Sequence, residues 1–156
     1  MEQVRKRHHV RGFSLLVGAI TLVIFWMLVP RSCGDQMAAR EIAVLREVLR
    51  INTAQAQYRS RFGKFASMLA QLGPPSTGVT GPPGPAAADL IPASLASGEK
   101  DGYTFILTAT SQGYTVNANP KIHNSSARRT FYADQNMIIH QNWSAEPANA
   151  GSPEAK

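Results

Sequence analysis

The sequence predicts an α+β protein in which a long N-terminal helix, embedded in a membrane over its first half, packs on a small four-stranded antiparallel sheet. Three observations predict this fold. An uncharged apolar run covers residues 13–29, a helical repeat of apolar residues continues to about residue 61, and apolar and polar residues alternate within 103–140. With 156 residues, 44% of them hydrophobic, the chain has room for one modest domain and is too apolar to be disordered.

We expect six consecutive segments. They are a basic leader at 1–12, a transmembrane helix at 13–30, an amphipathic helix at 31–65, a loop region at 66–102 with a Pro/Gly-rich insertion at 73–88, an antiparallel β-meander at 103–141 and a disordered tail at 142–156.

The leader and the apolar run together predict a membrane anchor. Residues 1–12 carry four basic residues and one acidic residue, which is half of the chain's net charge of +6. As a helix, residues 13–29 would span ~25 Å, at the short end of what crosses a bilayer core of ~30 Å. Because a basic flank stays cytoplasmic, we expect a single pass through the inner membrane, with the C-terminal domain periplasmic or extracellular.

The start of the apolar run carries a recognisable motif. The residues Arg11-Gly12-Phe13-Ser14-Leu15-Leu16 resemble the prepilin peptidase motif of type IV pilins and type II secretion pseudopilins. Stretches within 52–58, 90–105, 113–120 and 129–135 are similar to a bacterial pilin-like subgroup. The resemblance implies cleavage after Gly12 by a prepilin peptidase, methylation of the amine of Phe13, and assembly with other pilin-like subunits through the N-terminal helix.

The sequence departs from the family pattern at two places. Most members have a glutamate five residues after the cleavage site, where this chain has Val17. That glutamate pairs with the amine of a neighbouring subunit, so its absence favours a minor or tip subunit over a major shaft subunit. In the subgroup a glycine also follows Gln135 within two residues, where Asn136 and Met137 stand here.

The periodicity of 31–65 predicts one buried and one solvated helix face. The expected core stripe consists of residues three and four positions apart: Met37, Ala38, Ile42, Leu45, Val48, Leu49, Thr53 and Ala56. The charged residues between them predict the solvated face: Arg40, Glu41, Arg46, Glu47 and Arg50. Gly63 is expected to end the helix as a C-cap.

Period-two alternation predicts two hairpins after a short turn of helix at 90–97. Segments 103–108 and 114–119 flank one turn, and 129–133 and 137–140 flank the second.

The sequence contains no constellation that predicts an enzyme. Ser97 and Lys100 spell the Ser-x-x-Lys motif of penicillin-recognising enzymes, but the Ser-Asp-Asn and Lys-Thr-Gly elements are missing, so we interpret the segment as a turn leading into a strand. The histidines lack metal-ligand spacing, and Cys33 is the single cysteine. We therefore expect no catalytic residues, no metal, no cofactor and no small-molecule substrate.

One basic and aromatic cluster is a candidate binding site. Arg59, Arg61 and Lys64 alternate with three aromatic residues, which are Tyr58, Phe62 and Phe65. Such a cluster could bind a DNA backbone through charge and stacking. The alternative, which we favour, is a helix C-terminus where cations complement the helix dipole and the aromatic rings pack beneath.

Two functions follow from these observations. The first is a structural pilin-like subunit, anchored in the inner membrane and assembled in a type IV pilus or a type II secretion apparatus. The alternative is a single-pass, membrane-anchored periplasmic module that binds protein or DNA and does not polymerise.

Overall fold

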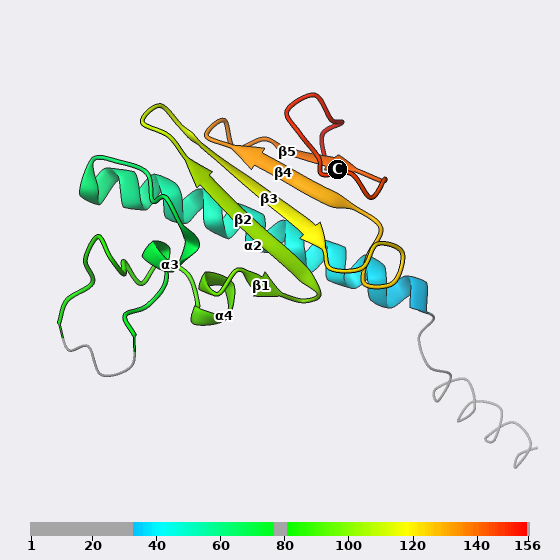
Figure 1. Ribbon diagram of the computed structural model, residues 1–156, viewed down its shortest axis with the longest axis horizontal. Helices are drawn as coiled ribbons and strands as arrows, with labels where there is room; N and C mark the ends of the chain where they lie inside the picture. Colours follow the sequence, from blue (N-terminus) through cyan, green and yellow to red (C-terminus); the bar gives the residue numbers. More distant parts are fainter. Residues whose placement is uncertain (1–32, 77–80, 156) are drawn as a thin grey trace, which may run out of the picture. The chain divides into compact units, whose positions relative to one another are not determined.

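The computed structural model describes residues 33–76 and 81–155 (Figure 1). The chain divides into two units, Met1–Cys33 and Gly34–Lys156, and nearly all described residues belong to the second. Gly12, Phe13 and the predicted transmembrane segment lie outside the described residues. Within the described ranges, no helix combines the length and the apolar character needed to cross a membrane.

The fold is α+β, and the residues that the structure describes form one long helix, two short helices and five strands. In chain order they are α2 (Cys33–Phe62), α3 (Leu69–Leu72), α4 (Ala93–Ala96), β1 (Glu99–Lys100), β2 (Tyr103–Ala109), β3 (Tyr114–Pro120), β4 (Thr130–Asp134) and β5 (Ile139–Asn142).

Helix α2 ends at the predicted cap. Gly63 has φ +74°, and its N–H donates to the carbonyl of Arg59 at 2.8 Å. A backbone in this left-handed region favours glycine, which has no Cβ to clash. The predicted C-cap is therefore confirmed.

The strands form one antiparallel sheet in the order β1-β2-β3-β4-β5. The two predicted hairpins are present as β2–β3 and β4–β5. The predicted count of four strands is wrong, because β1 adds a fifth strand that pairs Glu99 with Thr104 of β2. A strand of two residues is too short to show an alternating pattern, so the sequence predicts these residues as part of the loop region.

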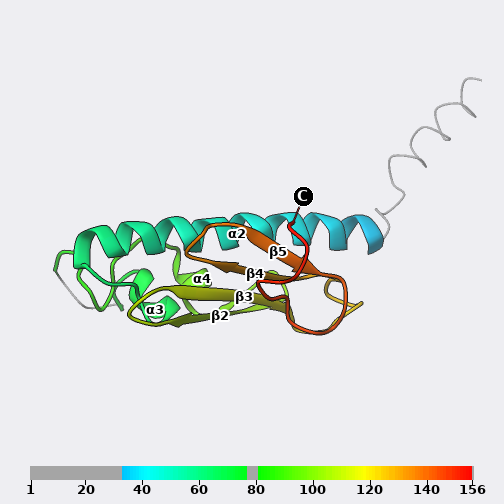
Figure 2. The same ribbon diagram turned by 90° about the horizontal axis from the view of Figure 1, so that it is seen from above.

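Helix α2 covers one face of the sheet as a separate layer (Figure 2). Alternate residues of β3, namely Tyr114, Val116 and Ala118, are buried on the side that packs in the core. Along α2 the largest buried apolar residues are Val44, Val48, Ile51, Ala54 and Tyr58.

The buried face of α2 is rotated relative to the predicted one. Of the expected core stripe, Val48 is fully buried, but Ile42 and Leu49 are 48% and 50% exposed. Ala38, Thr53 and Ala56 are exposed too. Conversely, Glu41 and Glu47, expected on the solvated face, are buried. The prediction was wrong for these residues because it treated every charged residue as solvated.

Both buried glutamates have partners from the sheet region. Glu41 Oε2 lies 2.7 Å from Nε of Arg129, and Glu41 Oε1 accepts the backbone N–H of Arg128 at 2.7 Å. Glu47 Oε1 lies 2.6 Å from Nζ of Lys100, and its Oε2 lies 3.2 Å from Arg50. A buried charge is tolerated when it is paired and hydrogen-bonded, and both carboxylates meet that condition.

The predicted loop region supplies part of the core. Leu69, Leu72, Ile91 and Leu95 are all buried. At Gly73 an added Cβ would lie within 2.4 Å of the Ala96 side chain, so glycine permits the close approach of α3 and α4. Residues 77–80 of the Pro/Gly insertion lie outside the described part.

Two contacts fix the region after α2 against the helix. The side-chain amide of Gln55 donates to the carbonyl of Ala66 and accepts its N–H, each at 2.9 Å. The hydroxyl of Tyr58 donates to the carbonyl of Pro85 at 2.6 Å. Polar side chains of α2 therefore supply hydrogen-bond partners for backbone groups that are not paired within a helix or a strand.

The tail after β5 is ordered, which differs from the disordered tail expected from composition. The N–H of Gln141 donates to the carbonyl of Pro153, and the N–H of Ala155 donates to Ile139, each at 2.8 Å. Ala148 is buried, and its carbonyl accepts from Asn117 of β3. The tail covers the edge of β5, and this pairing could not be recognised from its small polar residues.

Candidate functional site

The three predicted binding residues lie in the last turn of α2, which contains Arg59 and Arg61, and just after it, where Lys64 stands. Arg59, Arg61 and Lys64 are all exposed. Only Arg59 contacts an aromatic ring, with its guanidinium carbon 4.8 Å from the centroid of Phe65. Within the described chain, no carboxylate forms an ion pair with Arg59.

The aromatic residues of the cluster pack among themselves and on the sheet. Tyr58 and Phe62 have ring centroids 4.7 Å apart, and Phe65 lies 5.0 Å from Tyr114 of β3. One ring face of Phe65 is already used by Arg59. This packing agrees with the interpretation of a helix C-terminus with rings beneath it, because the rings contact one another, Tyr114 and Arg59.

Arg59 lines a cavity of about 460 Å³ between the end of α2 and the turns of the sheet. It is lined by Ala56, Arg59, Ser60, Phe65, Tyr114, Gln135 and Met137. Arg61 and Lys64 do not line it. The volume is in the range of small-molecule sites, which are mostly apolar with a few convergent polar groups.

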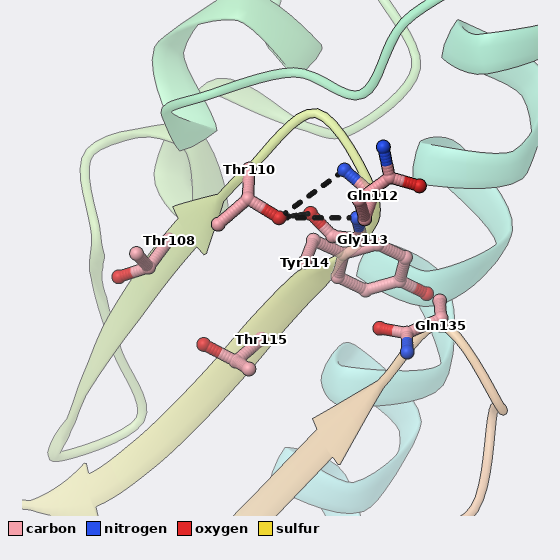
Figure 3. Close-up of a pocket in the computed structure, with 7 residues that line it drawn as sticks. All are labelled: Thr108, Thr110, Gln112, Gly113, Tyr114, Thr115 and Gln135. Atoms are coloured by element: carbon pink, nitrogen blue, oxygen red, sulfur yellow. Dashed lines mark hydrogen bonds between the residues drawn. The ribbon is translucent and has the colours of Figure 1, made fainter.

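A smaller cavity of about 220 Å³ shares Tyr114 and Gln135 with it (Figure 3). Its other lining residues are Thr108, Thr110, Gln112, Gly113 and Thr115. The hydroxyl of Thr110 accepts the N–H groups of Gln112 and Gly113 at 3.3 and 3.2 Å, which fixes the β2–β3 turn. A Cβ at Gly113 would lie 2.5 Å from Oε1 of Gln135, so this glycine allows Gln135 to lie against the turn.

Tyr114 forms the floor shared by the two cavities. Its hydroxyl donates to Oδ1 of Asn52 on α2 at 3.1 Å. Burial, and secondarily the negative charge of Asp134, raise the pKa of Tyr114 to about 12. The phenol is therefore neutral at physiological pH, which leaves Arg59 as the one charged group that lines the larger cavity.

Met137 enters the cavity from a strained backbone position. Its φ is +64°, in the left-handed region that favours glycine, and its N–H donates to the carbonyl of Asp134 at 3.0 Å. It is one of the two positions, Asn136 and Met137, at which the resemblance would place a glycine. Of these two residues Met137 has the left-handed conformation, and its side chain is half exposed.

The other groups considered in the sequence do not form reactive pairs. Lys100 pairs with Glu47, whereas the hydroxyl of Ser97 donates to the carbonyl of Ser94 at 2.9 Å. His123 and His140 each contact a backbone carbonyl. Across the residues that the structure describes, no group of His, Cys, Asp and Glu side chains could hold a metal ion.

Sequence reasoning found Arg59 and Phe65 but missed Ser60, Tyr114, Gln135 and Met137 as members of the same site. These residues come from α2, from β3 and from the turn before β5, far apart in the chain. The substitution of the expected glycine near Gln135 was the one signal that pointed to this turn.

Comparison of the chain with protein-family models, with curated proteins and with solved structures found no match in any of the three.

Proposed function

We propose that the protein is a pilin-like structural subunit, of the minor or tip kind, anchored in the inner membrane by residues 13–30. It assembles with other pilin-like subunits of a type IV pilus or type II secretion apparatus through its N-terminal helix. In this proposal a prepilin peptidase cleaves after Gly12, and the new N-terminus, Phe13, is methylated.

The observation that carries the proposal is the apolar stripe that α2 leaves uncovered by its own sheet. Ile42 and Leu49, two turns apart, are each about half exposed. Ala38, Thr53 and Ala56 continue the stripe as small, exposed residues. Small residues let a second helix approach closely, and burial of the two large side chains stabilises the contact.

The arrangement of charge on α2 also supports the proposal that this exposed stripe contacts another subunit. Its two buried glutamates are paired inside the domain, so the charged residues near the stripe are mainly basic, among them Arg46. Arg50 forms an ion pair with Glu47, which also pairs with Lys100. A subunit with this surface selects a neighbour that offers an apolar stripe flanked by carboxylates.

A membrane-anchored module that binds without polymerising is the second candidate. The cavity beside Arg59 favours it. Its DNA-binding form has weaker support, because Arg61 and Lys64 do not join Arg59 at the cavity and the nearby rings pack on one another.

Mass measurement and site-specific cross-linking of the full chain in bacterial membranes test the proposal. We expect a mature form that begins at methylated Phe13, and a photo-reactive residue at position 49 that cross-links to a second pilin-like subunit. The same residue at position 106 is the matched control, because Ile106 is equally exposed, at 50%, but lies on the sheet. An intact Met1 together with equal cross-linking at the two positions would contradict the proposal.

A further inference from the structure

The larger cavity combines one cation with an apolar and aromatic wall. The guanidinium of Arg59 is exposed and, within the described chain, has no carboxylate partner. Phe65, Tyr114 and Met137 supply the apolar wall, and Ser60 and Gln135 supply hydrogen-bonding groups.

The backbone at Met137 is a second, independent observation about the same cavity. A left-handed conformation is unfavourable for a non-glycine residue of this kind, and such strain clusters at ligand sites. Glycine would remove the strain but would also remove a half-exposed apolar side chain from the cavity wall. The thioether is a flexible group that adapts to ligands of varied shape.

The carboxylate of Asp134 is engaged by groups that do not line the cavity. The negative charge of Asp134 contributes to the raised pKa of Tyr114, but Asp134 does not line the cavity. Its carboxylate accepts the N–H of Asn136 at 2.9 Å and the hydroxyl of Tyr132 at 3.5 Å. The cavity itself therefore carries a net positive charge.

From these observations we infer that the cavity is a binding site for an organic carboxylate with an apolar or aromatic body. The carboxylate pairs with Arg59, whose planar guanidinium suits bidentate binding. The body of the ligand lies against Phe65 and Met137, and Gln135 and Ser60 donate to its remaining polar atoms. The ligand is either a free organic acid or the carboxyl-terminal residue of a peptide. The inference goes beyond the proposed function and does not depend on whether the subunit assembles.

Titration of the full chain in detergent micelles tests the site. The first arm compares 3-phenylpropionate with its neutral amide, and the second compares N-acetyl-Gly-Phe, with a free carboxyl group, with its C-terminal amide. The readout is the methyl resonance of Met137, assigned with Met137→Leu. We expect at least one acid to shift this resonance and to bind about tenfold or more tightly than its amide.

Three variants separate the site from general effects on the protein. Arg59→Gln should weaken binding of the acid about tenfold, whereas Arg61→Gln, which removes an exposed arginine two residues away, should leave it unchanged. Met137→Gly should raise the melting temperature and weaken binding, which a purely structural role for Met137 would not do. Binding is followed for that variant by calorimetry.

The source of the ligand is read from the two arms. Tighter binding of the peptide than of 3-phenylpropionate identifies a peptide carboxyl terminus, and the reverse order identifies a free organic acid. The inference is overturned if neither acid shifts the Met137 signal up to millimolar concentration. It is equally overturned if acids and amides bind alike, or if Arg61→Gln weakens binding as much as Arg59→Gln.

Discussion

A helix at a protein surface usually buries apolar residues and exposes polar ones, but α2 also buries polar residues on its inner face and exposes large apolar residues on its outer face. The face against the sheet includes four buried polar side chains, which are Glu41, Glu47, Asn52 and Gln55. The opposite face exposes Ile42 and Leu49. Each polar residue on the inner face has at least one partner at hydrogen-bonding distance. These residues are thus buried despite their polarity because each has a hydrogen-bond partner elsewhere in the domain, although Nδ2 of Asn52 has none.

Among changes to the two faces, removal of a buried charge from the inner face is expected to lower the free energy of unfolding the most. Glu41→Ala leaves Arg129, whose side chain is 11% exposed, without its carboxylate and frees two backbone N–H groups. Breaking a buried pair in this way costs about 3–5 kcal/mol. Urea unfolding of the full chain in detergent measures the loss.

Two variants control that measurement. Arg46→Ala removes an exposed charge from the same helix and should change the free energy of unfolding by less than about 0.5 kcal/mol. Glu41→Gln keeps an oxygen for the backbone N–H of Arg128 and should lie between the two. Equal stability of Glu41→Ala and Arg46→Ala would mean that the buried pair contributes nothing.

A neighbouring pair of apolar residues tests the boundary between the faces. Val48 is fully buried and Leu49 is half exposed. Val48→Ala should lower the free energy of unfolding by about 2 kcal/mol, whereas Leu49→Ala should change it by less than about 0.5 kcal/mol, although leucine is the larger residue. Thermal and urea unfolding give both values. A larger loss for Leu49→Ala would show that the sheet covers the predicted stripe instead.

The smallest expected effect is a loss of stability at alkaline pH that comes from Tyr114 of β3, whose hydroxyl donates to Asn52 of α2. The folded chain holds the phenol proton of Tyr114 up to a pKa of about 12, whereas the unfolded chain releases it near 10. Between these values the folded state binds more protons at Tyr114, so the contribution of Tyr114 to stability is constant below about pH 10 and falls as the pH rises toward 12.

Tyr114→Phe should reduce this alkaline loss by about 1–2 kcal/mol. The remaining slope should come from the other tyrosines whose pKa burial raises, which are Tyr103, Tyr58 and Tyr132. Unfolding midpoints in urea at pH 8 to 11.5, compared between the two proteins, measure the difference. A variant with the same alkaline slope as the original chain would show that Tyr114 is not held neutral by the fold.

Much of the architecture could be predicted from local patterns. The helical repeat, the glycine after Phe62 and the two alternating stretches each act over a few residues, and they gave the long helix, its C-cap and both hairpins. The strand β1 and the ordered tail could not be predicted in this way. Each depends on backbone hydrogen bonds to a strand that already exists, namely β2 and β5.

The same difference between local patterns and long-range contacts applies to the candidate site. The sequence by itself determined that Arg59 stands among aromatic residues at a helix end and that a non-glycine residue follows Gln135. Only the tertiary structure decided that Arg59 and Met137 line one cavity while Arg61 and Lys64 do not. It also decided which face of α2 is buried. The physical reason is that a charge or a polar group is placed by its partner, and the partners Arg129, Lys100 and Tyr114 lie 50 or more residues away in the chain.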